Sequence, residues 1–173
     1  MTKPIQQIDF KQLETPIGTM FACAVPEGIC LLEFTERKIL QQQYTYLTKA
    51  LNAEIVPGEN PHFLVLEQQL KEYFEGHRKT FSVPLVIPGT DFRVKAWQGL
   101  QQIPYGTVRS YKEQAAALGT PDAIRAVASA NGANRISIII PCHRLVASDG
   151  ALTGYGGGVW RKQWLLDFEE KHK

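Results

Sequence analysis

The sequence predicts an α+β protein with a strand-rich N-terminal half and a mostly helical C-terminal half. Short runs of β-branched and apolar residues, separated by turn residues, occur mainly before residue 90. After residue 90, apolar residues recur at helical spacing between capping and stop signals. The halves meet at Val86–Thr90, where Pro88 and Gly89 interrupt regular structure, so we expect domains at 1–88 and 89–173.

The first half contains segments of strand-like composition bounded by turn residues, at Thr19–Val25, Ile29–Phe34 and Thr80–Val86. A turn at Thr15–Gly18 precedes the first of them, and Pro26-Glu27-Gly28 is the expected hairpin loop. The pattern predicts a small antiparallel sheet.

Two helices are expected beside this sheet. One covers Arg37–Ala50, and the other has Asn60 as its N-cap, Pro61 at the first helical position and Gly76 as its stop. No pattern in this half indicates chemistry, so we interpret it as a scaffold.

Helices dominate the second half. The first has an apolar face composed of Phe92, Ala96, Trp97, Leu100 and Ile103. It ends at Pro104-Tyr105-Gly106, which cannot continue a helix. The next opens with a capping box at Ser110–Glu113 and stops at Gly119.

Immediately afterwards, Thr120-Pro121-Asp122 supplies an N-cap, a proline at the first position and an acid near the positive end of the dipole. The predicted helix 120–131 and its predecessor form a candidate helix-turn-helix, with 120–131 in the recognition position. We expect Ile124, Val127 and Ala128 to pack inward.

The opposite face of this helix is expected to carry Asp122, Arg125, Ala126 and Ser129. It offers no Asn, Gln or Lys to read base edges in the major groove. A smooth helix with one arginine suits the narrow minor groove, where the guanidinium can enter the base stack. The alternative is an alanine-rich packing helix with Arg125 on its solvated side.

Composition indicates the class of protein and its cellular compartment. The chain has 173 residues, of which 44% are hydrophobic and 21% charged, as in an ordinary globular protein. The opening residues lack the apolar core of a signal peptide, and no run of 18 apolar residues occurs, so we expect a cytoplasmic protein without membrane contact. Cys23, Cys30 and Cys142 give no disulfide framework and suit a reducing compartment.

Charge is distributed unevenly. Residues 1–90 carry 8 Lys and Arg against 10 Asp and Glu, whereas residues 91–173 carry 11 against 7. The basic excess of the second half is compatible with a polyanionic partner, but it is far below that of a dedicated nucleic-acid-binding arm.

The strongest chemical signal is the run Ile136–Ile140 followed by Pro141, Cys142 and His143. The β-branched run predicts a short buried strand, which Pro141 ends. Neighbouring strand residues face opposite sides, so Cys142 and His143 can cooperate only in a turn or the first turn of a helix. Unpaired N–H groups and an imidazole favour the thiolate, which is the nucleophile. A buried core cysteine is the alternative and the commoner role of an isolated cysteine.

Three segments together resemble the O6-alkylguanine-DNA alkyltransferases (methylated-DNA–protein-cysteine methyltransferases): Pro141-Cys142-His143-Arg144, the glycine-rich loop 150–158, and Arg161–Leu166. The likeness covers residues 90–169 almost continuously and is thinner before them. It implies a ribonuclease H-like N-terminal domain and a winged helix-turn-helix domain that carries the reactive cysteine. The implied activity is direct-reversal DNA repair, in which an alkyl group passes irreversibly and stoichiometrically from O6 of guanine, or O4 of thymine, to Cys142.

The resemblance also implies roles for single residues. Cys142 would accept the alkyl group as a thiolate, His143 would take its proton through a water, and Glu169 would orient His143. We expect the apolar face of the last helix, with Trp160, Trp164, Leu165 and Phe168, to hold Glu169 rigidly. Asn134 would pin the turn before the reactive segment.

The damaged nucleotide would be flipped out from the minor-groove side, because O6 inside a duplex cannot reach a buried thiol. Tyr111 would donate a hydrogen bond to the flipped base, and Arg125 would fill the vacated place. The other expected DNA contacts are Ala123, Ala126 and Ser129, and the expected pocket residues are Pro141, Tyr155, Gly156 and Gly157.

The implied partner is double-stranded DNA containing O6-alkylguanine, bound by a monomer. No cofactor is implied, and Cys23 and Cys30 do not match the zinc ligands of zinc-binding members, so no metal is expected. One alternative is a non-catalytic protein that senses alkylated DNA. The other is a Cys-His hydrolase working through an acyl-enzyme, for which the sequence offers no hydrolase elbow.

Overall fold

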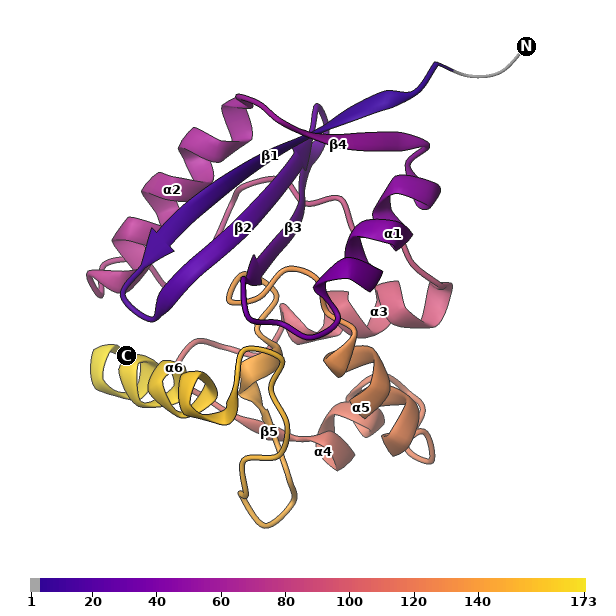
Figure 1. Ribbon diagram of the computed structural model, residues 1–173. Helices are drawn as coiled ribbons and strands as arrows, with labels where there is room; N and C mark the ends of the chain where they lie inside the picture. Colours follow the sequence, from indigo (N-terminus) through magenta and orange to yellow (C-terminus); the bar gives the residue numbers. More distant parts are fainter. Residues whose placement is uncertain (1–3) are drawn as a thin grey trace. The chain divides into compact units, whose positions relative to one another are not determined.

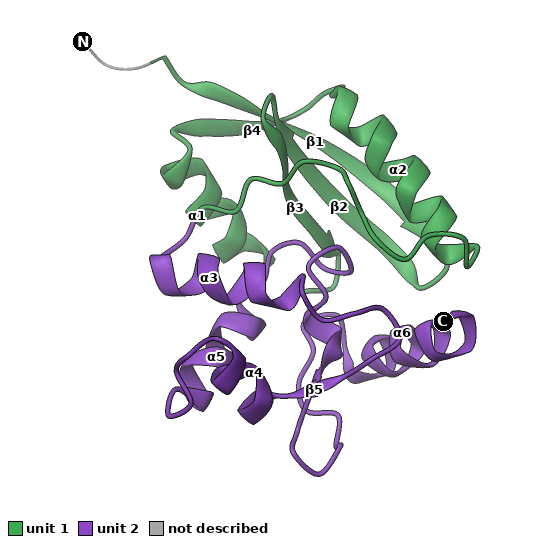
Figure 2. Cartoon of the chain, turned by 180° about the vertical axis from the view of Figure 1, so that it is seen from behind, with its two compact units in different colours: residues 1–88 green, residues 89–173 purple. Residues whose placement is uncertain are grey.

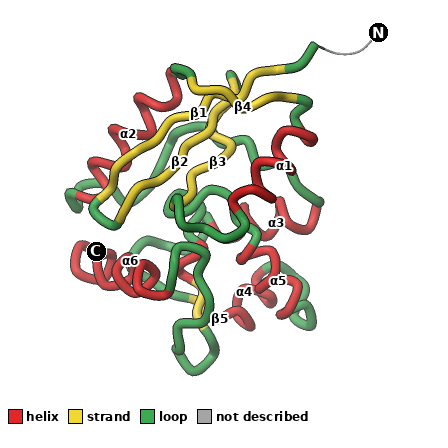
Figure 3. The backbone as a smooth tube through the Cα atoms, in the orientation of Figure 1, coloured by secondary structure: helices red, strands yellow, loops and turns green. Residues whose placement is uncertain are grey.

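The computed structural model describes residues 4–173 (Figure 1). The chain forms two compact units, residues 1–88 and 89–173 (Figure 2). The long strands belong to the first unit, and helices joined by long loops make up most of the second (Figure 3). No helix within residues 4–173 has the length and apolar character needed to cross a membrane.

A four-stranded sheet in the order β3-β2-β1-β4 forms the centre of the first unit. Its first three strands are consecutive and antiparallel: β1 (Gln6–Thr15), β2 (Gly18–Val25) and β3 (Gly28–Phe34). The fourth strand, β4 (Ala53–Pro57), pairs with β1 in parallel, so the sheet is mixed and the purely antiparallel prediction is wrong. Helix α1 (Leu40–Ala50) lies between β3 and β4 and supplies the crossover that a parallel pair requires.

Strand β1 was not predicted, because helices cover both of its faces. Phe10 lines a hollow shared with Tyr44 of α1. Lys11, the next residue, forms an ion pair of 3.0 Å with Glu67 of α2 (Pro61–Phe74). Neighbouring strand residues point to opposite faces, so α1 and α2 cover opposite faces of the sheet, and the strand lacks a simple apolar-polar alternation.

The segment Thr80–Val86 is not the predicted strand. Its one bridge joins Leu85 to Ile29 of β3. Pro84 has no N–H to donate, and the Gln69 side chain accepts hydrogen bonds from the N–H groups of Ser82 and Val83 at 3.0 and 3.3 Å. Pairing with β3 is therefore limited to this bridge, where the N–H of Ile29 donates to the carbonyl of Pro84 and the N–H of Val86 donates to that of Ile29, both at 2.8 Å.

Helix α2 begins as predicted, with the Asn60 side chain accepting from the N–H of His62 at 2.9 Å and Pro61 in the first turn. Helix α1 begins at Leu40, three residues later than predicted. Arg37 instead lies in the preceding turn, where its guanidinium forms a buried ion pair of 2.7 Å with Glu33.

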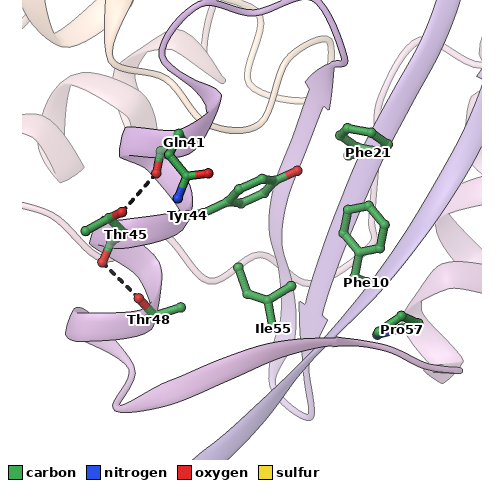
Figure 4. Close-up of a pocket in the computed structure, with 8 residues that line it drawn as sticks. All are labelled: Phe10, Phe21, Gln41, Tyr44, Thr45, Thr48, Ile55 and Pro57. Carbon is green, nitrogen blue, oxygen red and sulfur yellow. Dashed lines mark hydrogen bonds between the residues drawn. The ribbon is translucent and has the colours of Figure 1, made fainter.

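A hollow of about 510 Å³ opens between α1 and the sheet (Figure 4). Aromatic and aliphatic side chains from the sheet face Tyr44 and a polar edge of α1; its lining is Phe10, Phe21, Gln41, Tyr44, Thr45, Thr48, Ile55 and Pro57. Every lining residue belongs to the first unit, whereas the candidate reactive residues belong to the second.

The second unit contains four α-helices among its described residues: α3 (Asp91–Leu100), α4 (Tyr111–Ala117), α5 (Ile124–Gly132) and α6 (Val159–His172). The capping box is confirmed, because Ser110 and Glu113 exchange side-chain-to-backbone hydrogen bonds of 3.0 and 3.2 Å. Trp97 of α3 donates from its indole to the carbonyl of Ala130 at 2.8 Å and so ties α3 to α5.

Helix α5 starts at Ile124, not at Thr120 as predicted. The N–H of Thr120 donates to the carbonyl of Ala115 at 3.0 Å, so this residue closes α4 and does not cap α5. The N–H of Ala123 then donates to Thr120, which makes Pro121 and Asp122 the centre of a turn.

The later start changes which face of α5 is buried. The buried residues are Val127, Ala130 and Asn131. Ile124 and Ala128, which were expected to pack inward, are exposed, and Ile124 keeps 38% of its surface. The predicted exposure of Arg125, Ala126 and Ser129 is confirmed.

Candidate active site

The segment leading to Cys142 is a compact turn, so the predicted strand over Ile136–Ile140 is wrong. The N–H of Ile140 donates to the carbonyl of Ile136 at 3.1 Å, and the N–H of Ile139 donates to Ser137 at 2.9 Å. Ile138, between these last two, has a φ of 73°. This is the rare, strained form of γ-turn, which costs about 1–3 kcal/mol for a β-branched residue.

Asn134 holds this turn closed from inside. Its side chain is fully buried, and its Nδ2 donates to the carbonyls of Ile140 at 2.9 Å and Ile136 at 3.3 Å. Its Oδ1 accepts from the N–H of Ile136 at 2.9 Å. One amide therefore forms three hydrogen bonds with the backbone of this turn.

Pro141 makes a second tight turn directly before the cysteine. Its φ of −81° and ψ of 64° and the 2.8 Å hydrogen bond from the N–H of Cys142 to Ile140 define an inverse γ-turn. The next three residues, Cys142–Arg144, form a 3₁₀ turn, η1. Cys142 and His143 thus sit in a helical turn, which is the geometry that the adjacent pair needs to cooperate.

The thiol of Cys142 is buried, with 4% of the residue exposed. Asn131, near the end of α5, donates from Nδ2 to the carbonyl of Cys142 at 3.3 Å. This bond ties the reactive segment to the helix whose exposed face carries Arg125.

A buried network joins η1 to α6. His143 Nε2 lies 2.8 Å from Glu169 Oε2, and both side chains are almost fully buried. Arg144 grips the same carboxylate with two bonds, Nε to Oε1 at 2.8 Å and Nη2 to Oε2 at 3.0 Å. Its Nη1 donates to the carbonyl of Ile103 at 2.8 Å. The network fixes three separate parts of the unit.

These contacts determine the ionisation states of Glu169 and His143. Burial alone would raise the pKa of Glu169, but the charges and hydrogen bonds of His143 and Arg144 hold that pKa well below its ordinary value. The two hydrogen bonds from the Arg144 guanidinium favour the anionic form of the carboxylate whether or not His143 is charged. Burial lowers the pKa of His143 in spite of Glu169, so the imidazole is neutral at neutral pH.

The tautomer of His143 follows from this arrangement. An ionised Glu169 can only accept, so the neutral imidazole carries its hydrogen on Nε2. Nδ1 is buried and has no hydrogen-bond partner among the described residues. It therefore presents a lone pair that can accept a proton.

A short parallel pairing places Tyr111 in the same region. β5 (Arg109–Ser110) pairs with β6 (Leu145–Val146), which directly follows η1, so Ser110 lies opposite Val146 and Tyr111 opens α4 at the end of this pairing. The ammonium nitrogen of Lys162 lies 5.9 Å from the centre of the Tyr111 ring.

The buried face of α6 differs from the prediction. It consists of Arg161, Lys162, Leu165 and Glu169, of which three are charged. Trp160 is 55% exposed, and Trp164 stacks on Phe168 at 4.9 Å along a more exposed face. The apolar-face prediction for Glu169 is therefore wrong, because partners inside the unit compensate the inward charges.

Tyr155, Gly156 and Gly157, the predicted pocket residues, lie in the loop before α6. Arg161 holds this loop by donating from Nη1 to the carbonyl of Gly157 at 2.8 Å. Gly156 is exposed, and Tyr155 is half-buried.

The predicted residues thus form two groups within one unit. The first comprises the reactive segment with Pro141, Cys142, His143 and Asn134, together with Glu169 and Tyr111. The second lies on α5, where Arg125, Ala126 and Ser129 are exposed and Ala123 is the half-buried N-cap. No group of three or more His, Cys, Asp or Glu side chains within residues 4–173 could hold a metal ion.

The structural contacts of Arg144, Lys162 and Asn131 were not predicted from the sequence. The first two stood in motifs that carried the resemblance, but no role was attached to them. Leu165 is an obvious core residue of the last helix, and Lys162 and Glu169 lie three positions before it and four after it. This helical spacing could have shown that both charged side chains point inward.

Family models match nearly the whole chain. Residues 91–171 match the DNA-binding domain of 6-O-methylguanine DNA methyltransferase, and residues 10–87 match the ribonuclease-like domain of the same proteins. These ranges fall within the second and first compact units, respectively.

Individual relatives carry the same family description. The constitutive methylated-DNA–protein-cysteine methyltransferase of Bacillus subtilis is 42% identical over 157 residues, which cover 90% of this chain and 92% of that protein. The Mycobacterium tuberculosis O6-methylguanine methyltransferase structure superposes with a TM-score of 0.81 at 37% identity, covering 96% of this chain and 94% of that one. A second structure of the M. tuberculosis protein, in complex with DNA, also has a TM-score of 0.81, with coverages of 95% and 94%.

The lowered pKa of His143 predicts that acid weakens the fold. Between that pKa and the ordinary value of 6.5, the unfolded chain binds more protons than the folded chain. The stabilisation that a neutral His143 contributes is therefore complete above this pH range and is lost as the pH falls through it. We expect the free energy of unfolding in urea to fall from pH 7.5 to pH 5.5, by up to about 1.4 kcal/mol per pH unit for one group. The lowered pKa of Glu169 also makes the fold less stable in acid, but only at pH values below the ordinary carboxyl pKa of 4.5.

His143→Gln, which still can donate to Glu169, should show a smaller loss than the unchanged protein over this pH range. His77→Gln, at an exposed position of the first unit, is the matched control and should keep the full loss. Equal pH dependence in the unchanged protein and the His143 variant would contradict a buried, neutral His143.

Proposed function

Because this chain belongs to the O6-methylguanine-DNA methyltransferase family, whose members repair DNA by alkyl transfer to a cysteine, we propose that Cys142 is the acceptor in this chain. The observation that carries the proposal is the buried series Cys142, His143, Glu169 and Arg144. It offers a thiol, a lone pair next to it in sequence, and a carboxylate of fixed charge and orientation.

The proposed reaction begins with ionisation of the thiol. The proton of Cys142 passes through a bridging water to Nδ1 of His143, whose positive charge is then balanced by Glu169. The thiolate forms a bond to the alkyl carbon while the bond from that carbon to O6 of guanine breaks. The electron pair of the broken bond stays on the base. A hydrogen bond from Tyr111 stabilises the departing base.

Protons and charge balance over the whole reaction. One thiol hydrogen is lost, one hydrogen is gained by guanine, and the alkyl group moves from oxygen to sulfur. A thioether has no good leaving group, so each molecule reacts once. The non-catalytic alternative is not favoured, because the relatives at 40% identity or more that cover nine-tenths of this chain are named for the transfer to cysteine.

DNA is the partner, and we propose that the recognised lesion is O6-alkylguanine, with O4-alkylthymine as a second substrate. The lesion would be flipped toward Cys142 through the minor groove, with Arg125 of α5 inserted in its place. Small exposed residues beside Arg125 support this, because Ala126 and Ser129 let the helix approach the backbone closely. Tyr155, Gly156 and Gly157 would line the pocket for the flipped base.

We further propose that the two compact units are domains with separate roles, a scaffold at 1–88 and a DNA-binding, alkyl-accepting domain at 89–173. A monomer is sufficient for this chemistry, since every proposed catalytic group lies in one unit. The three cysteines are buried thiols, which suits a reducing compartment such as the cytoplasm.

Incubation with an oligonucleotide containing O6-methylguanine should add one methyl group to each protein molecule. The intact mass should rise by a single methylene unit, carried by the peptide that contains Cys142, because nothing in the site regenerates the thiol. Cys142→Ser should bind the same DNA without gaining mass. Cys23→Ser, in the buried sheet of the first unit, is the matched control and should still be methylated. More than one methyl group removed from DNA per protein molecule would refute single use.

Arg125→Ala should slow repair of duplex DNA much more than repair of the same oligonucleotide as a single strand. Extracting a base from a duplex costs a few kcal/mol, and about 1.4 kcal/mol corresponds to a factor of ten, so we expect at least about a tenfold difference between the two substrates. Lys171→Ala removes an equal charge from the exposed end of α6 and should affect both substrates alike. Equal losses on both substrates for the Arg125 variant would make it an ordinary surface arginine.

A further inference from the structure

Ile124 is a large apolar side chain on the exposed surface of α5. It opens the helix, and 38% of its surface is exposed, although the sequence pattern predicted that it packs inward. Single exposed apolar residues are common on protein surfaces, so exposure alone assigns no role to Ile124. Its position next to Arg125 is the observation that points to one.

Ile124 continues the face of α5 that carries Arg125. Consecutive residues of an α-helix are about 100° apart around its axis, and residues four apart lie one above the other. Ile124 and Ala128 therefore form one exposed row, and Arg125 and Ser129 form the row beside it. The residue on the other side of Arg125 is Ala126, so the large apolar side chain flanks the arginine on one side only.

Net charge supplies little of the affinity of this helix for DNA. The helix and the turn before it, residues 120–132, contain one acid, Asp122, and one base, Arg125, and both are exposed. Their charges cancel, and a surface without net positive charge releases few counterions from DNA on binding. Contacts of the uncharged side chains must therefore contribute to binding at α5.

The minor groove offers an apolar partner for such a side chain. Its walls include the C–H groups of the deoxyribose rings, and proteins that bind there frequently insert leucine, isoleucine or phenylalanine between base steps. The other exposed residues of α5 beside Arg125 are alanine, serine and glycine, which have short side chains or none. Within residues 124–132, all of which the structure describes, Ile124 is thus the exposed apolar side chain long enough to act as a wedge.

We propose that Ile124 is an apolar wedge for duplex DNA, which packs into the minor groove next to Arg125 and helps to hold the base step open. The inference rests on the proposed function, because it assumes that α5 enters the minor groove. It assigns Ile124 a role in selecting duplex DNA that is separate from the chemistry at Cys142. The affinity that the wedge adds does not depend on salt, because burial of an uncharged side chain releases no counterion.

The test measures DNA affinity by fluorescence anisotropy, from about 50 to 200 mM KCl, with the duplex and single-stranded forms of one oligonucleotide. The oligonucleotide contains no lesion, so Cys142 does not react. Ile124→Ala is compared with Leu64→Ala, the matched control, which removes a side chain that is 68% exposed on α2 of the first unit. Alanine is a better helix former than isoleucine, so the substitution does not weaken α5 itself. Thermal unfolding confirms that each variant is folded.

Ile124→Ala should weaken duplex binding by about fivefold to tenfold at every salt concentration, because less apolar surface leaves water. The slope of log affinity against log salt concentration should stay the same, whereas Arg125→Ala should reduce that slope by about one. Ile124→Leu, which keeps the apolar volume, should retain most of the duplex affinity, and Leu64→Ala should retain all of it. Single-stranded DNA has no minor groove, so Ile124→Ala should weaken its binding much less.

Equal duplex affinity of the folded Ile124→Ala and Leu64→Ala variants would overturn the proposal. An equal loss on duplex and single-stranded DNA for Ile124→Ala would also overturn it, because the contact would then not be with the minor groove.

Failure of this inference and failure of the proposed function give different results. If the unchanged protein takes up a methyl group on Cys142 from O6-methylguanine DNA but Ile124→Ala binds duplex DNA normally, only the role of Ile124 is wrong. If Ile124→Ala shows the expected loss but the unchanged protein gains no mass from that DNA, the wedge is supported and the proposed alkyl transfer fails.

Discussion

The contact on which the second unit depends is the bidentate grip of Arg144 on the buried carboxylate of Glu169. A carboxylate in the protein interior is costly unless its oxygens are fully compensated. Here two bonds from Arg144 and one from His143 compensate it, and the remaining Arg144 nitrogen donates to the carbonyl of Ile103. These bonds join η1, α6 and the turn after α3, so removal of one member leaves uncompensated charge behind.

The same contact determines the state of His143, the group that we propose takes the proton of Cys142. Because Arg144 donates to both oxygens of the carboxylate, Glu169 stays anionic and directs the hydrogen of His143 to Nε2. The bare Nδ1 is then the group that can take a proton. Upstream, Asn134 stabilises a strained turn at Ile138 that delivers Cys142 into the same 3₁₀ turn as His143. Backbone strain at this point is balanced by three side-chain hydrogen bonds, as is typical of functional sites.

Local signals in the sequence predicted those elements whose cause is local. The Asn60 cap, the Pro61 start of α2 and the capping box at Ser110 depend on residues within four positions of one another, and all are confirmed. The contact between His143 and Glu169 was also expected, because the family resemblance identifies a glutamate at this position of α6.

Features set by distant partners could not be predicted in this way. Helices cover both faces of β1, and its partner β4 lies far along the chain, with Gln6 opposite Ala53. Neither strand therefore shows a simple alternation of apolar and polar residues in the sequence. The Ile136–Ile140 run has strand composition, but the Asn134 side chain takes the place of a neighbouring strand. The inward face of α6 looks polar because its charges are compensated from η1 and the loop before the helix.

The most direct test of this account is nitrogen-15 NMR of the His143 imidazole in the unalkylated protein at neutral pH. The account predicts a neutral ring, protonated on Nε2, with Nδ1 showing the chemical shift of an unprotonated nitrogen. The Nε2 hydrogen should exchange slowly, because it is buried against Glu169. An imidazolium ring, or a neutral ring with its hydrogen on Nδ1, would contradict the claim that Glu169 and Arg144 prepare His143 to accept the proton of Cys142.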